Sequence, residues 1–260
     1  MLIVAATLLG LLCGSFANVL IARVPHGEGW ARGSSRCPRC KQDIAWYDNI
    51  PVLSWLWLKR RCRHCAEPIS ARYPAVELTV GVLFGLVAWQ FGSTAVAWLL
   101  AFSALLTVAL AAIDFEHHRL PDQLVFTMAG AVAVLLVADA VVTGEWSPLA
   151  RAGIGALALG GFYFALWFAY PKGLGFGDVK LAVPVGAVLG YLGWGALAVG
   201  AIGGPLVGGL LAIGASIRAG GIKGVRFAYG PAIIVAFWVG VLWGPQIADW
   251  YVDWSVGLAA

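Results

Sequence analysis

Residues 95–113 read AVAWLLAFSALLTVALAAI, and Asp114 follows them directly. This run of nineteen residues contains no charged side chain. A helix needs about 20 predominantly apolar residues to cross the hydrocarbon core of a bilayer. The stretch therefore predicts a membrane-spanning helix with an acid at its end.

The rest of the chain has the same character. Of its 260 residues, 61% are hydrophobic and only 12% are charged, whereas soluble domains are about a quarter charged. The sixth apolar run is short and contains Pro184. We therefore expect an all-α polytopic membrane protein with about eight transmembrane helices, at 2–21, 74–91, 95–113, 123–142, 152–170, 179–194, 196–216 and 229–247.

The basic residues predict the orientation. If the eight spans alternate, sixteen of the seventeen Lys and Arg residues lie on one side of the membrane and only Arg151 lies on the other. The positive-inside rule places that side in the cytosol and both termini outside. The net charge of +4 then reflects topology and attraction to membrane lipid, and it requires no nucleic-acid partner. We expect a first helix at 1–21, a cytosolic insert at 22–73 and a seven-helix bundle at 74–260.

Glycines recur at four-residue spacing inside the predicted helices. This spacing places small residues on one helix face, where two backbones approach closely. Tight helix packing is therefore the expected role of Gly81 and Gly85, Gly186 and Gly190, and Gly200, Gly204 and Gly208.

The insert contains two Cys-x-x-Cys pairs, separated by twenty-one residues. Two such pairs at this distance predict a structural zinc site with four cysteine ligands, and a reducing cytosol argues against disulfides. A metal also stabilises an insert too small to bury a large core. A pair of redox motifs and a nucleic-acid-binding ribbon are the alternatives. The predicted ligands are Cys37, Cys40, Cys62 and Cys65.

Two acids border the apolar runs. Asp114 follows the third run, and Asp178 precedes the sixth in Gly175-Phe176-Gly177-Asp178-Val179-Lys180. The alternating topology puts both at the cytosolic face, in loops at similar depth. Two carboxylates within hydrogen-bonding reach share a proton, and one can act as base while the other acts as acid. The alternatives are an interfacial charge for Asp114 and a helix cap for Asp178.

The motifs around these acids resemble those of the bacterial type IV prepilin peptidases. Gly175-Phe176-Gly177-Asp178 with Lys180 is similar to the GxGD signature of that family, and Ile113-Asp114 through Leu120-Pro121-Asp122 is similar to its first aspartate motif. The resemblance covers almost the whole chain. Further similar blocks are residues 14–19, 46–55 and 69–74, then Glu77, and Gly230-Pro231.

This resemblance implies an aspartic endopeptidase of the bacterial cytoplasmic (inner) membrane, multi-pass, with its active site facing the cytosol. Such enzymes remove the leader peptide of type IV prepilins or pseudopilins after a glycine. Members with the cysteine-bearing insert also methylate the new N-terminal residue, with S-adenosylmethionine as the donor. Asp114 and Asp178 would be catalytic, and Gly175, Gly177, Lys180 and Glu77 would support the site. The sequence indicates neither the S-adenosylmethionine contacts nor an oligomeric state.

One departure from the family pattern concerns methyl transfer. The family usually has Gly-Arg-Cys at the second cysteine pair, where this chain has Arg60-Arg61-Cys62. A peptidase without methyltransferase activity is therefore the first alternative. A proton-coupled transporter is a remote second, because Asp139 is the only further acid within the expected spans besides Glu77 and the paired candidates.

Overall fold

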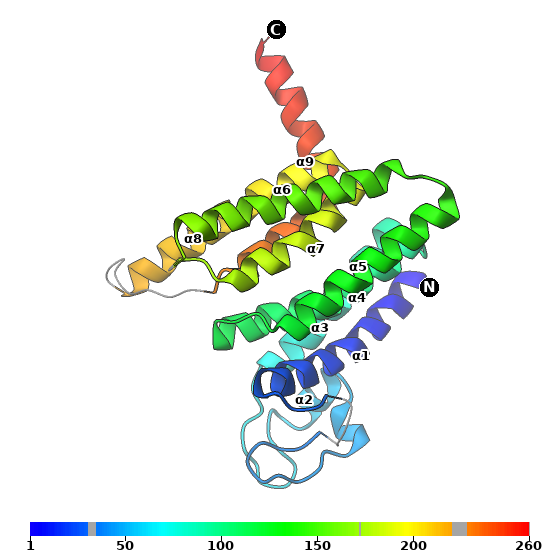
Figure 1. The fold of residues 1–260 in the computed structure, drawn as a ribbon. Coiled ribbons are helices and arrows are strands. Elements are labelled where there is room, and N and C mark those ends of the chain that lie inside the picture. The colour runs from blue at the N-terminus through cyan, green and yellow to red at the C-terminus, as the bar shows by residue number, and fades with distance from the viewer. Residues whose placement is uncertain (31–34, 172, 220–227, 260) are drawn as a thin grey trace. The chain divides into compact units, whose positions relative to one another are not determined.

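The computed structural model describes residues 1–30, 35–171, 173–219 and 228–259 of the chain (Figure 1). Arg32, Lys172, Lys223 and Arg226, four of the basic residues that predict the orientation, lie outside these ranges. The long helices are α1 (Leu2–Arg23), α3 (Arg72–Phe91), α4 (Ala95–His117), α5 (Asp122–Thr143), α6 (Ser147–Ala169), α7 (Phe176–Leu192), α8 (Trp194–Ala219) and α9 (Gly230–Ala259). Between α1 and α3 lie the short helices η1 (Val24–His26), η2 (Trp46–Asn49) and α2 (Leu53–Trp57).

The expected all-α membrane architecture is confirmed. Within the described residues, seven helices are long and apolar enough to cross a membrane. The remaining long helix, α7, has 17 residues and corresponds to the short sixth run of the sequence. No β-strand occurs in the described ranges, where the only β-type pairings are two isolated bridges in the insert.

The end of α4 differs from the expectation, because Asp114 lies within the helix and not in a loop. The helix continues for three residues past Asp114 to His117, since no glycine or proline interrupts it. His118 then adopts a left-handed conformation with φ of 50°, and its N–H donates to the Asp114 carbonyl at 2.8 Å. A residue in this conformation is a common helix ending. The backbone of Asp114 is therefore fixed by the last turn of α4.

The chain divides into two compact units, Met1–Ala112 and Ile113–Ala260. In the first unit, α1 packs closely along α3. A Cβ atom added at Gly14 would lie 2.6 Å from Cα of Glu77, and one at Gly81 would lie 2.8 Å from the Leu11 side chain. The close packing predicted from the glycine spacing is therefore present at this helix pair.

In the second unit, α6 packs along α7 and α8 packs along α9 (Figure 1). A Cβ at Gly186 of α7 would lie 2.3 Å from the carbonyl oxygen of Gly155 on α6. Backbone contact of this kind explains why glycine occupies both positions. Two glycines of α8 serve another purpose: a Cβ at Gly204 would collide with the hydroxyl of Tyr163, and one at Gly208 would collide with the ring of Tyr229.

The insert repeats one local structure at an offset of 25 residues. The Cys37 N–H donates to the Gln42 carbonyl at 3.0 Å, and the Cys62 N–H donates to the Glu67 carbonyl at 2.9 Å. The fifth residue of each turn, Lys41 or Ala66, has a positive φ near 60°. The two Cys-x-x-Cys turns are therefore equivalent, as in a ribbon whose turns both present thiols to one point.

Candidate active site and cysteine cluster

Asp114 is positioned by the start of α9. The N–H of Gly230 donates to Oδ2 of Asp114 at 2.9 Å, and the Asp114 residue is only 5% exposed. Gly230 is the first residue of α9, and the N-terminus of a helix carries a partial positive charge. The carboxylate therefore receives both a hydrogen bond and a favourable field from a helix far from it in sequence.

Asp178 is positioned by its own helix. It is the third residue of α7, and its Oδ2 accepts the N–H of Gly175, the N-cap residue, at 3.0 Å. The helix-capping interpretation of Asp178 is thus correct, but capping does not exclude a role in chemistry. The residue is 6% exposed, and its carboxylate also lies at the positive end of a helix.

The structure brings the two acids to one cavity of about 260 Å³. Both side chains line it, and the charge of Asp114 acts on Asp178. The lining also includes Gly175, Gly177 and Tyr229. Each acid is held by a glycine N–H at a helix start, so the two carboxylates have equivalent settings. Such a pair can carry one proton between them and act on a water molecule.

Lys180 does not point at the acid pair. Its Nζ binds both carboxylate oxygens of Asp122 at 2.7 and 2.8 Å and lies over the rings of Phe126 and Phe176. This ion pair ties α7 to the start of α5. Lys180 therefore supports the cavity by fixing the helix that carries Asp178.

The sequence reading missed two tyrosines close to Asp178. Tyr163 on α6 is 1% exposed, and its hydroxyl forms a hydrogen bond with that of Tyr229. The two rings meet edge to face, with centroids 5.9 Å apart, and Asp178 lies within electrostatic range of both residues. The sequence feature that could have indicated these tyrosines is the pair Gly204 and Gly208 on α8, because the two tyrosine side chains fill the space beside these glycines.

Glu77 lies in the first unit, where it holds a strained turn of the insert. Its Oε2 accepts the N–H of Val52 at 2.8 Å, and its carboxylate also bonds the Ser15 side chain. Val52 has φ of 62° and ψ of −49°, and the Leu53 N–H donates to the Pro51 carbonyl at 2.6 Å. This is a γ-turn with a conformation that β-branched residues rarely adopt. Glu77 thus connects the insert to α3.

Asp139, the remaining acid within the spans, is paired at a separate place. It accepts a short hydrogen bond from the hydroxyl of Tyr191 on α7. The side chain of Arg151 donates to the carbonyls of Gly190 and Tyr191 at the same end of α7, at 3.4 and 3.3 Å. Asp139 therefore joins α5 to the end of α7 and does not line the cavity of the acid pair.

The four cysteines of the insert converge as predicted. Their sulfur atoms lie within 4.8 Å of one another, and Sγ of Cys37 is 3.8 Å from Sγ of Cys65. Four thiolates at about 2.3 Å from a tetrahedral zinc ion would be about 3.8 Å apart. The backbone N–H of Cys40 hydrogen-bonds the Cys37 sulfur and lowers the pKa of that thiol to about 7. The cluster can therefore hold a metal ion.

Arg60 is accommodated without loss of the second cysteine turn. It has φ of 65°, a conformation that glycine adopts freely and that costs other residues about 1–2 kcal/mol. Its guanidinium lies 4.9 Å from the centroid of the Trp55 ring, and its carbonyl accepts the Ile69 N–H at 2.7 Å. A glycine would adopt this left-handed backbone without that cost, and the stacking contact of Arg60 offsets part of it.

Two family models match the chain. The model of the bacterial peptidase A24 N-terminal domain matches residues 8–91, and that of the type IV leader peptidase family matches residues 98–213. No solved structure matches the chain significantly.

Curated proteins named prepilin leader peptidase/N-methyltransferase match this chain, and the following three match along most of it. The Stutzerimonas stutzeri protein is 33% identical, over 97% of this chain and 94% of its own. The Aeromonas salmonicida protein is 36% identical, over 95% and 92%. The Neisseria gonorrhoeae protein is 35% identical, over 90% and 88%.

Proposed function

Because the chain belongs to the type IV leader peptidase family, we propose that it removes the leader peptide of type IV prepilins or pseudopilins. The cleavage follows a glycine, and the same protein then methylates the new N-terminal residue. The chain is an integral protein of the inner membrane and a hydrolase. The observation that carries the catalytic assignment is the shared cavity of Asp114 and Asp178.

The setting of the acids suits a pair with one net negative charge. Two adjacent carboxylates repel one another when both are ionised, so one of them retains a proton. The N-termini of α7 and α9 and the N–H groups of Gly175 and Gly230 favour the remaining negative charge. Each of these hydrogen bonds uses one lone pair, and a carboxylate has about four. Capacity to bind a water molecule therefore remains.

Hydrolysis then follows from proton exchange within the pair. The ionised acid takes a proton from the water, whose oxygen attacks the scissile carbonyl carbon. The protonated acid gives its proton to the carbonyl oxygen. When the tetrahedral intermediate collapses, the C–N bond breaks, the leaving nitrogen takes the proton that the first acid removed from water, and a hydroxyl proton of the intermediate returns to the second acid. The product carries a free N-terminal amine, which is the group that a methyltransferase modifies.

Methyl transfer requires a donor beside this amine. S-adenosylmethionine supplies an electrophilic methyl group: a new N–CH₃ bond forms, the S–CH₃ bond breaks with its electrons staying on sulfur, and the amine loses a proton to water. The chain must therefore hold the donor and align the amine with it. We place this activity in the insert of residues 22–73 and its junction with α1 and α3.

A single product analysis tests both activities. Purified protein, S-adenosylmethionine and a prepilin are incubated, and the product is analysed by mass spectrometry. We expect a pilin that lacks its leader and is heavier by one CH₂ group at its N-terminus. A trimmed but unmethylated product, with a donor that a control enzyme accepts, would leave only the peptidase. An intact substrate would overturn the whole proposal.

We also propose that the cysteine cluster binds structural zinc. Elemental analysis of the purified protein should find about one zinc per chain, and Cys62→Ala should lose it. Cys13→Ala is the matched control, because Cys13 lies on α1 outside the cluster. Equal zinc content in the two variants would contradict the assignment.

The orientation is a further part of the proposal. With the insert in the cytosol, a cysteine placed at Ser147 should react in intact cells with a thiol reagent that does not cross membranes, and one placed at Lys59 should not. Both positions are exposed: Ser147 begins α6, and Lys59 follows α2. The reverse labelling pattern would place the active site outside.

A further inference from the structure

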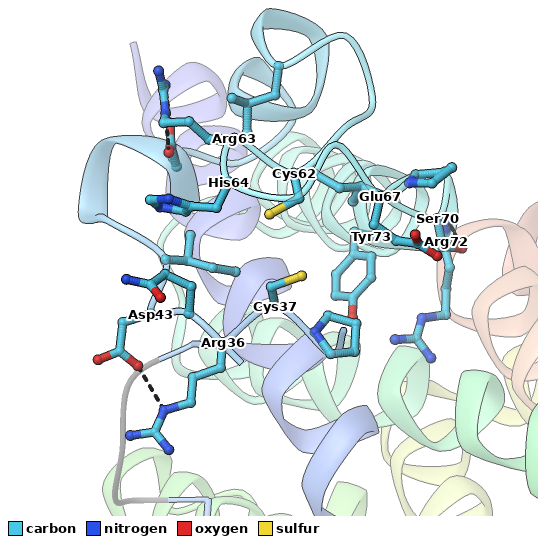
Figure 2. Close-up of a pocket in the computed structure, with 17 residues that line it drawn as sticks. Arg36, Cys37, Asp43, Cys62, Arg63, His64, Glu67, Ser70, Arg72 and Tyr73 are labelled. Atoms are coloured by element: carbon cyan, nitrogen blue, oxygen red, sulfur yellow. Dashed lines mark hydrogen bonds and ion pairs between the residues drawn. The ribbon is translucent and has the colours of Figure 1, made fainter. Parts of the chain in front are cut away.

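A second cavity, of about 290 Å³, lies within the insert (Figure 2). Both cysteine turns, the end of α2 and the start of α3 contribute to its lining of seventeen residues. Small-molecule sites begin at roughly 300 Å³. Only two cluster cysteines, Cys37 and Cys62, are among the lining residues. The cavity is therefore larger than a metal site between the four cysteine sulfur atoms, and most of its lining residues are not cluster cysteines.

The charges along this cavity are mixed and balanced. Three carboxylates line it, those of Asp43, Asp48 and Glu67, and so do three guanidinium groups, those of Arg36, Arg63 and Arg72. A site for phosphate or nucleic acid would be lined mainly by cations. Mixed lining suits a ligand that carries both signs of charge.

The two sides of the cavity differ in character. Arg36 and Asp43 lie at one side, with Nε donating to Oδ1 at 2.7 Å (Figure 2). Both side chains are 62% exposed. Arg72 and Tyr73 lie at the other side (Figure 2). The Arg72 guanidinium sits 4.9 Å from the centroid of the Tyr73 ring, so the ring face already binds a cation. Apolar side chains of Ile44, Leu58 and Ile69 complete the lining.

We propose that this cavity binds S-adenosylmethionine, an inference that rests on the methyltransferase part of the proposed function. The amino-acid end of the donor is a zwitterion, and the Arg36–Asp43 pair offers one partner for its carboxylate and one for its ammonium group. The adenosine lies toward the apolar residues and the Tyr73 ring, an aromatic surface on which a base can stack.

The position of the cavity fits a substrate that is anchored in the membrane. Arg72 and Tyr73 are the first two residues of the membrane helix α3. The Tyr73 carbonyl accepts a hydrogen bond from the Asn18 side chain of α1 at 3.1 Å. The cavity thus lies where the insert meets two membrane helices.

The test measures binding, separately from activity. Isothermal titration calorimetry uses the purified, zinc-containing full-length protein and S-adenosylhomocysteine, the demethylated product. We expect Arg36→Ala and Asp43→Ala each to weaken binding at least tenfold, and Leu58→Trp to abolish it by filling the cavity. Lys59→Ala is the control: it removes an exposed cation of the insert, and Lys59 does not line the cavity. ATP, which shares the adenosine but carries phosphates, should not compete.

The outcomes separate this inference from the function on which it rests. Zinc content shows that each variant retains a folded insert. If the three cavity variants retain zinc and bind S-adenosylhomocysteine as the wild type does, the donor site lies elsewhere in the protein. The proposed function still stands in that case, provided that the wild-type protein cleaves and methylates the prepilin. A wild-type protein that cleaves prepilin but binds no S-adenosylhomocysteine overturns both the methyltransferase assignment and this site.

Discussion

Asp114→Asn and Asp178→Asn should each insert normally and each abolish leader removal. An amide cannot accept a proton from water, and acid–base catalysis contributes about 10²–10⁴-fold to a rate. Because the two acids act as a pair, either substitution alone removes the exchange of the proton. The residual rate of each single variant and of the double variant should therefore be similar. Cleavage of a purified prepilin in detergent measures this directly.

Asp139→Asn is the matched control for these variants. Asp139 also belongs to a membrane helix of the second unit, but it bonds Tyr191 and lies outside the cavity of the acid pair. We expect it to cleave within a few-fold of the wild-type rate. Full cleavage by either Asp114→Asn or Asp178→Asn would refute the pairing. Loss of cleavage in Asp139→Asn as well would instead point to a chain of acids, as a transporter requires.

Much of the fold follows from one-dimensional patterns. An apolar run long enough to span a bilayer specifies a helix, because no other element satisfies its backbone polar groups in lipid. The eight runs therefore predicted the long helices to within a few residues, except that α6 begins five residues earlier than expected and α4 and α9 continue past the ends of their runs. The spacing of the cysteines predicted their convergence for a similar reason: each pair is a local turn, and a site of four sulfur ligands requires the two turns to meet.

The contacts that join distant segments were not predictable in the same way. The bond between Gly230 and Asp114 spans 116 residues, and the γ-turn at Val52 is held by Glu77, 25 residues away. No local pattern encodes which backbone N–H a buried carboxylate will accept. The four-residue spacing of Gly204 and Gly208 was evident in the sequence, but it predicted only a helix face of small residues. That two tyrosine rings fill this face depends on how α6, α8 and the start of α9 come together.

Gly230→Ala should reduce cleavage about tenfold to a hundredfold without preventing insertion. A Cβ atom at this position would lie 2.8 Å from Oδ2 of Asp114 and 3.2 Å from a methyl carbon of Leu120. The contact with the carboxylate is too short to persist, so either the side chain of Asp114 or the start of α9 must move. A misplacement of about 1 Å at a reacting group costs on the order of 10²-fold in rate.

Two other glycines make this prediction specific. Gly161→Ala on α6 adds the same methyl group where no atom lies within 4 Å, and it should cleave like the wild type. Gly175→Ala is intermediate, because its Cβ would lie 3.3 Å from Oδ2 of Asp178, a distance that a small shift relieves. The expected order of loss is therefore Gly230→Ala, then Gly175→Ala, then Gly161→Ala, measured as kcat for one prepilin. The order tests the geometry itself, since all three changes add one methyl group and differ in how closely it approaches a catalytic carboxylate. If Gly230→Ala matched Gly161→Ala, the carboxylate of Asp114 would not depend on the start of α9 for its position.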